Sequence, residues 1–235
     1  MSATASDTIL EIRDGVAWFT FNRPQKANAL TLAMVQALQQ AIQQSTDDHA
    51  IRALVLTGAG GRAFSAGADL GSLTDNSAEF RNLRRETFAA VMRALLDFGK
   101  PAIAAVDGAA CGYGMMLAMG CDQTIATRKA RFSLPEINKG TPTLTGITLV
   151  SERLNNTLAA DLVLSGRWVE SDEALRLALV KEIVNDENLM ERAQTVALAF
   201  GKHNATAYAQ NKRWLNRELR DALAAASRES ATLHP

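Results

Sequence analysis

The sequence has little of what marks disulfide-rich or metal-binding proteins. Two cysteines, Cys111 and Cys121, are too few for a disulfide framework in a chain of 235 residues. Both fall in apolar segments, so we expect small buried side chains in a reducing compartment rather than reactive thiols. The three histidines, His49, His203 and His234, are scattered, with no Cys or Asp at ligand spacing from them. The sequence therefore predicts no metal site.

The sequence also lacks an excess of charge of either sign. Lys and Arg together number 25, as do Asp and Glu, so the formal net charge is zero. A neutral chain is not steered toward nucleic acid or an acidic membrane, and neither is expected as a partner. Residues 1–7 have neither the basic nor the apolar region of a signal peptide, and the longest apolar run is well short of a membrane span. We therefore expect a cytoplasmic protein.

What the sequence does have is enough apolar residues, 47%, for a substantial core. Asp14-Gly15 between two β-rich runs predicts a hairpin, and Thr31 is the expected N-cap of a helix over residues 31–45. Further strands are expected at residues 51–57, 103–106 and 122–127, and further helices at 77–98, 112–120, 171–178, 187–200 and 205–229. The alternation of strands and helices predicts an α/β fold with parallel strands, comprising a core over residues 1–190 and a C-terminal helical segment over 191–235.

Two glycine-rich turns follow buried strands in this pattern. The first is Phe-Ser-Ala-Gly-Ala-Asp-Leu over residues 64–70, and the second lies in the glycine-rich run over residues 106–122. Small residues let backbone N–H groups face outward, and each turn opens into a helix whose first N–H groups have no helical partner. Either turn alone is equally consistent with an ordinary loop, and a lone G-x-G is a weak signal. Together they could place two N–H donors on one oxygen, as in an oxyanion hole.

The sequence resembles the crotonase superfamily, also called the enoyl-CoA hydratase/isomerase family. The resemblance covers roughly residues 8–200 and consists of ordered motifs: residues 21–30, 64–70, 105–122, 132–137 with Gly140, and 165–167 with Glu173-Ala174 and Leu179-Val180. It implies a crotonase-like core of stacked ββα units in a spiral, followed by a helical tail. It also implies a homotrimer, or a dimer of trimers, with tails that pack against neighbouring subunits. The alternative for residues 205–229 is a helix that lies on its own subunit.

The resemblance also implies site residues. The two oxyanion donors are expected to be the N–H groups of Ala66 and Tyr113, the latter standing where the family usually has glycine and crowding the entrance. An acyl thioester, carried by CoA or by an acyl-carrier protein, is the implied ligand, with no other cofactor. The residues expected to line its path are Lys26, Ala27, Ala68, Asp69, Leu70, Gly112, Met116 and Lys212. For Lys212, a solvated helix charge is an equally good interpretation.

The departures from the family pattern concern the acids. Hydratases of this family carry two glutamates, and the first belongs at the position of Met116, whose thioether cannot transfer protons. The second matches Glu136, which lies between apolar residues, so we expect partial desolvation to raise its pKa and make it a better base. Residues 141–146 replace the hydratase segment that follows it.

One base and one oxyanion hole suit the isomerisation of a 3-enoyl thioester to a 2-enoyl thioester. Three alternatives stay open. A single glutamate could hydrate a 2-enoyl-CoA slowly, a malonyl-type thioester could lose carbon dioxide, or the protein could bind acyl thioesters without catalysis. The products separate these functions: a shifted double bond, a 3-hydroxyacyl thioester, carbon dioxide, or none.

Overall fold

A computed structural model of the chain describes residues 6–69 and 77–233. The chain enters through the predicted hairpin, strands β1 (Thr8–Arg13) and β2 (Val16–Phe21), which turns at Asp14 and Gly15 with φ angles of 51° and 78°. The hairpin forms one edge of a six-stranded sheet in the order β1-β2-β3-β5-β7-β10. Every pairing from β2 onward is parallel, as the alternation of strands and helices predicts.

The remaining strands of this sheet are β3 (Ala53–Gly58), β5 (Ala102–Val106), β7 (Gln123–Thr127) and β10 (Glu182–Val184). Short strands β4 (Ala63–Ser65), β6 (Ala109–Cys111), β8 (Arg131–Ser133) and β9 (Val169–Glu170) pair into a second sheet. Each of β3, β5 and β7 is followed by one strand of the second sheet and then by helical structure. This repetition of ββα units confirms the predicted spiral.

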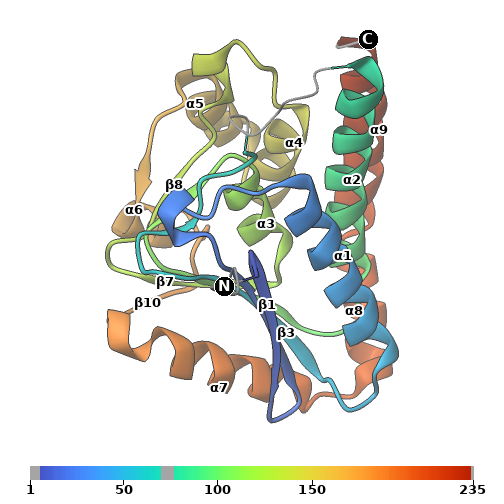
Figure 1. Cartoon of the computed structure of the whole chain (residues 1–235), viewed down its shortest axis with the longest axis vertical. Helices are drawn as coiled ribbons and strands as arrows, with labels where there is room; N and C mark the ends of the chain where they lie inside the picture. Colours follow the sequence, from blue (N-terminus) through green and yellow to red (C-terminus); the bar gives the residue numbers. More distant parts are fainter. Residues whose placement is uncertain (1–5, 70–76, 234–235) are drawn as a thin grey trace, which may run out of the picture.

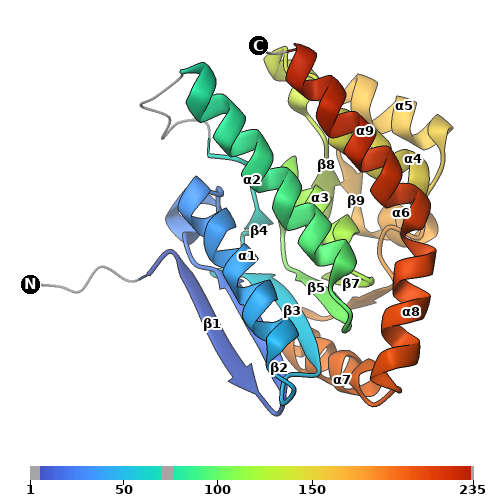
Figure 2. The same ribbon diagram turned by 90° about the vertical axis from the view of Figure 1, so that its right-hand side faces the viewer.

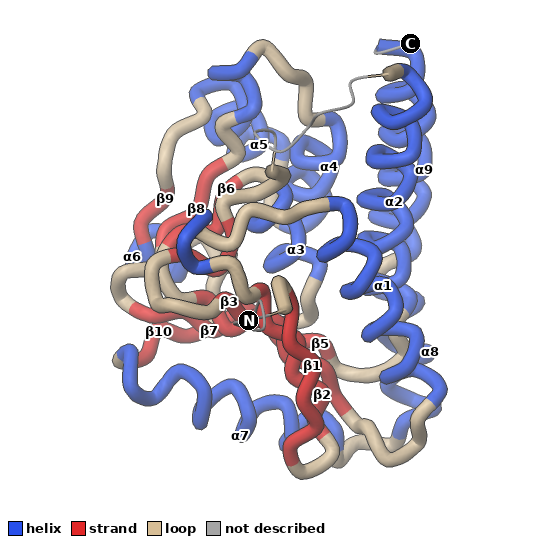
Figure 3. The backbone as a smooth tube through the Cα atoms, viewed as in Figure 1, coloured by secondary structure: helices blue, strands red, loops and turns tan. Residues whose placement is uncertain are grey.

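Three helices cover one face of the large sheet: α1 (Leu32–Asp47), α2 (Ala78–Asp97) and α3 (Tyr113–Gly120) (Figures 1 and 3). Thr31 caps α1 as predicted, since its Oγ1 accepts a hydrogen bond from the Met34 N–H at 3.2 Å. Helix α3 is buried along its whole length, so its small and flexible residues fill the centre of the fold.

Helix α7 (Leu189–Gly201) covers the other face of the large sheet. Alternate residues of a strand point to opposite faces. Trp18 and Val55 therefore pack against α7, where Ala193 and Ala197 are buried, while their sequence neighbours face α1 to α3. The predicted core boundary at residue 190 falls at the start of α7.

The other helical segments are α4 (Leu144–Arg153), α5 (Asn156–Ser165), α6 (Ser171–Arg176), α8 (Ala205–Leu215) and α9 (Arg217–Leu233), with 3-10 turns η1 (Pro24–Lys26), η2 (Glu136–Lys139) and η3 (Asp186–Asn188). The single helix expected over residues 205–229 breaks at Asn216, whose side-chain amide donates to the Leu96 carbonyl. Helix α9 then runs back beside α2 and contacts α4 in the same chain (Figure 2). Within residues 6–69 and 77–233, no helix has the length and apolarity needed to cross a membrane.

A buried ion pair fastens α8 to the sheet. The Lys212 Nζ, with its side chain 5% exposed, lies 2.7 Å from Asp122 Oδ2 and donates to the Lys100 carbonyl at 3.2 Å. The same Asp122 oxygen accepts from the Ala102 N–H and the Tyr208 hydroxyl. Asp122 thus joins the start of β5 to α8.

We expect Lys212→Met to lower the free energy of unfolding by about 3 kcal/mol. This is the low end for a broken buried pair, because Asp122 keeps its two other donors. Urea denaturation measures the effect, with the exposed Lys202→Met as the matched control. Equal stability of the two variants would contradict the structural role of Lys212.

Candidate active site

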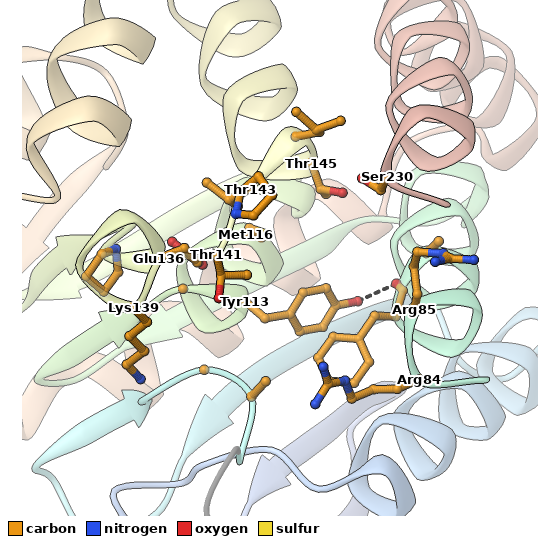
Figure 4. Close-up of a pocket in the computed structure, with 18 of the residues that line it drawn as sticks. Arg84, Arg85, Tyr113, Met116, Glu136, Lys139, Thr141, Thr143, Thr145 and Ser230 are labelled. Carbon is orange, nitrogen blue, oxygen red and sulfur yellow. Dashed lines mark hydrogen bonds between the residues drawn. The ribbon is translucent and has the colours of Figure 1, made fainter. Parts of the chain in front are cut away.

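A pocket of about 440 Å³ lies where the two glycine turns meet. Its walls come from the turn after β4, the start of α3, η2, the loop into α4, one face of α2 and the far end of α9 (Figure 4). Six segments distant in sequence therefore converge on one cavity.

The first turn shows that the expected donor Ala66 is wrong. The Ala66 N–H already donates to the Ala27 carbonyl at 2.9 Å, so it is unavailable to a ligand. A backbone bridge pairs Ala68 with Leu30: the Leu30 N–H donates to the Gly67 carbonyl and the Asp69 N–H to the Leu30 carbonyl. In this arrangement the N–H of Ala68 itself points away from Leu30. It has no partner among the described residues, and Ala68 lines the pocket.

The second turn supplies the other donor at Tyr113, as predicted. Tyr113 is the first residue of α3, so its N–H has no helical acceptor, and none of the described residues accepts from it. A Cβ atom on Gly67 would lie 3.3 Å from the Tyr113 nitrogen, which shows how closely the two turns approach. The N–H groups of Ala68 and Tyr113 therefore flank Gly67, an arrangement suited to a developing oxyanion.

The Tyr113 side chain lies against α2. Its hydroxyl donates to the Phe88 carbonyl at 2.6 Å, and the two rings lie 4.3 Å apart between centroids. Burial raises the pKa of this hydroxyl, which keeps the phenol neutral. The ring lines the pocket, and the phenol joins α3 to α2.

Glu136 begins η2 and faces the second turn. A Cβ atom on Gly112, whose φ is 54°, would lie 3.0 Å from Glu136 Oε1, so a side chain there would crowd the carboxyl group. The other oxygen, Oε2, is buried and makes no hydrogen bond to any residue that the structure describes. Burial raises the pKa of Glu136, and this effect outweighs the opposing influences of its own backbone and of Lys139. A carboxylate with one unpaired oxygen and a raised pKa is well suited to accept a proton.

Met116 lies one helical turn beyond the Tyr113 donor and is 5% exposed. A Cβ atom on Gly146, in α4, would lie 3.2 Å from Met116 Cε, so the thioether is packed under the start of α4. The loop into α4 lines the pocket with Thr141, Pro142 and Thr143. Among the described residues lining the pocket, Glu136 is the one acid.

The other predicted site residues that the structure describes do not line the pocket. Lys26 is exposed in η1, while Ala27 accepts the Ala66 hydrogen bond and so holds the first turn. Asp69 lies 2.9 Å from the Arg23 guanidinium. Lys212 is held by its ion pair and does not line the cavity. Leu70 lies outside the described residues.

Sequence reasoning missed the basic residues of the pocket. Arg81, Arg84 and Arg85 line it together with Phe88, and Lys139 lines it from η2. The spacing of the first four, at i, i+3, i+4 and i+7, places them on one face of α2. That spacing was visible in the sequence.

The raised pKa of Glu136 predicts a pH-dependent stability difference. Because protonation favours the folded state, this contribution to stability is present below the ordinary carboxyl range and is lost as pH rises through the folded-state pKa. We expect Glu136→Gln to melt at a higher temperature than the wild type at neutral pH, with the difference shrinking in acid. Calorimetry across pH checks this, with the exposed Glu152→Gln as control. Superimposable melting curves at every pH would contradict it.

Comparison with known proteins agrees with this geometry. The family model described as Enoyl-CoA hydratase/isomerase matches residues 11–235. The chain is 35% identical over 217 residues to the short-chain-enoyl-CoA hydratase of Clostridium acetobutylicum, covering 90% of this chain and 82% of that protein. It is 34% identical to the crotonyl-CoA hydratase of Syntrophomonas wolfei, covering 80% and 73%. The crystal structure of enoyl-CoA hydratase from Bacillus anthracis superimposes with a TM-score of 0.86 at 25% identity, covering 98% and 92%. The chain is an enzyme of the enoyl-CoA hydratase/isomerase family, with the crotonase fold.

Proposed function

We propose that the protein isomerises a 3-enoyl-CoA to a 2-enoyl-CoA. The observation that carries this proposal is the single acid among the described pocket residues, Glu136, combined with a packed methionine at Met116. A double-bond shift needs one group that removes and returns a proton, whereas the two-glutamate pattern of hydratases positions and splits a water. The reaction is redox-neutral and requires no cofactor beyond the CoA of the substrate.

The geometry suggests a two-step proton transfer. The thioester oxygen accepts hydrogen bonds from the Ala68 and Tyr113 N–H groups, which acidifies C2. Glu136 removes a C2 proton, and the negative charge spreads over a dienolate whose oxygen remains in the same donor pair. The protonated Glu136 then returns the proton to C4. Water takes no part in these two proton transfers, which agrees with the apolar side chain of Met116.

Hydration of a 2-enoyl-CoA is the second candidate, favoured by the names of the similar proteins. The compared relatives and the structural neighbour are all named hydratases. The hydroxyl-bearing Thr141 and Thr143 line the pocket and could hold a water beside Glu136. Glu136 would then serve as both base and acid.

The trimer or dimer of trimers, and the cytoplasmic location, belong to the same proposal. Their support is the family membership. Sedimentation of the purified chain would test the assembly.

Products distinguish the two reactions. Supplied separately with 3-hexenoyl-CoA and 2-hexenoyl-CoA, the wild type should shift the double bond of the first much faster than it forms 3-hydroxyhexanoyl-CoA from the second. Glu136→Gln should bind both thioesters normally but lose isomerisation, because an amide cannot accept the C2 proton. Hydration as fast as isomerisation would replace our proposal by the second candidate.

Met116→Glu tests why hydration is weak. It restores an acid on α3 but not the loop into α4, so we expect only slight hydratase activity. A carboxylate in this buried position also costs several kcal/mol unless it is paired or protonated, and the variant should be less stable. Product analysis and thermal melting measure the two effects. Vigorous hydration by this variant would show that the missing acid alone determines the reaction.

Ala68→Pro tests the oxyanion donor. Proline removes the free N–H, and loss of one such donor typically lowers kcat by about 10²–10³. Ala68→Gly keeps the N–H and is the matched control, expected to remain active. Melting temperatures establish that both variants fold. Near-normal turnover by a folded Ala68→Pro would show that the thioester oxygen does not bind at the Ala68 N–H.

A further inference from the structure

Arg84 is a half-buried cation in the pocket, with no acidic partner within residues 6–69 and 77–233. None of the ion pairs or hydrogen bonds formed within the described residues involves it. Burial, together with the like charge of Arg81, lowers its pKa. Arg85 follows on the same face of α2, so positive charge is concentrated in this wall. A partly desolvated arginine beside a second cation favours an anion.

The position of Arg84 relative to the reacting groups indicates where that anion would lie. Figure 4 shows Arg84 reaching from α2 toward the pocket interior, with Glu136 on the opposite side and Tyr113 between them. The apolar side chains that line the same pocket include Phe88, Ala89 and Met116. A ligand that spans the pocket would therefore be apolar in the middle and anionic at the Arg84 end.

We propose that the preferred substrate is an enoyl thioester whose acyl chain ends in a carboxylate, bound by Arg84. This inference rests on the proposed function for the orientation of the thioester, which lies at Ala68, Tyr113 and Glu136. The distal carboxylate forms charge-assisted hydrogen bonds with the guanidinium, which presents two parallel donors. Burial of the pair behind the apolar wall strengthens these bonds.

The experiment compares two acyl ends on one carrier. Wild type is assayed with 3-hexenoyl-CoA and with 3-hexenedioyl-CoA, which differ only in the terminal methyl or carboxylate group. We expect a higher kcat/KM for the carboxylated substrate. Arg84→Met should lower that value by roughly tenfold to a hundredfold, as for the loss of a charged hydrogen bond, and should change the methyl-ended substrate little. The exposed Arg93→Met, on the same helix but outside the pocket, is the matched control.

A second pair of substrates separates the acyl carboxylate from the phosphates of the carrier. The same acyl chains are presented as pantetheine thioesters, which carry no phosphate. If Arg84 binds the acyl end, the discrimination persists with pantetheine and is lost in Arg84→Met. If Arg84→Met weakens both CoA substrates equally and has no effect on pantetheine thioesters, the arginine binds carrier phosphate and the inference is overturned. A wild-type preference for the methyl end also overturns it.

Binding distinguishes failure of this inference from failure of the proposed function. If wild type turns over neither 3-enoyl thioester, the isomerase proposal fails. Calorimetric titration with the saturated thioesters adipyl-CoA and hexanoyl-CoA then tests whether Arg84 binds the terminal carboxylate of the acyl chain. Tighter binding of adipyl-CoA by wild type, lost in Arg84→Met, supports the inference without any turnover. Equal affinities overturn it.

Discussion

The site depends on the close approach of two backbone turns at Gly67. Gly67 adopts φ of 87°, and a Cβ atom there would lie 2.7 Å from the Cys111 carbonyl oxygen. Any side chain would force the turns apart and separate the Ala68 and Tyr113 N–H groups. The parallel order of the strands brings β4 and β6 side by side, so both turns leave the small sheet at the same edge. Gly112 repeats the constraint beside Glu136, where a side chain would displace the carboxyl group.

The pocket keeps Glu136 and the arginines of α2 on opposite walls. Glu136 lies on η2, against the buried second turn, while the arginines lie on α2. Were Glu136 paired with Arg84, a buried ion pair would stabilise the carboxylate and lower its pKa, making it a poorer base. The Tyr113 phenol stands between these walls and fastens α2 to α3 through Phe88. Tyr113, which stands where the family usually has glycine, therefore helps to fix the position of α2 relative to α3 in the site.

Local patterns predicted the hairpin, the strands at residues 51–57, 103–106 and 122–127, and the Thr31 cap, because each follows from residues close in sequence. The repeated ββα units and the choice of Glu136 as the base came from the family resemblance, and the short strands of the second sheet were not predicted. The choice between Ala66 and Ala68 could not be predicted, since it depends on hydrogen bonds to Ala27 and Leu30, far upstream. The structural role of Lys212 could not be predicted either, because it depends on an ion pair with Asp122, which is distant in the sequence. The break at Asn216 depends on the Leu96 carbonyl of another helix. By contrast, the basic face of α2 could have been predicted from the helical spacing of Arg81, Arg84 and Arg85. It was missed because these residues belong to no family motif.

The wall formed by α9 also has a consequence for the order in which the site is assembled during synthesis. Ser227 and Ser230 line the pocket, whereas the turn bearing Ala68 leaves the ribosome much earlier. Synthesis proceeds from the N-terminus, so the strands and helices of the spiral leave the ribosome before α9 does. A nascent chain would carry the oxyanion turns and Glu136 without a closed cavity around them. Retention of substrate would then begin only after residue 230 has been translated and α9 has docked beside α2 and α4.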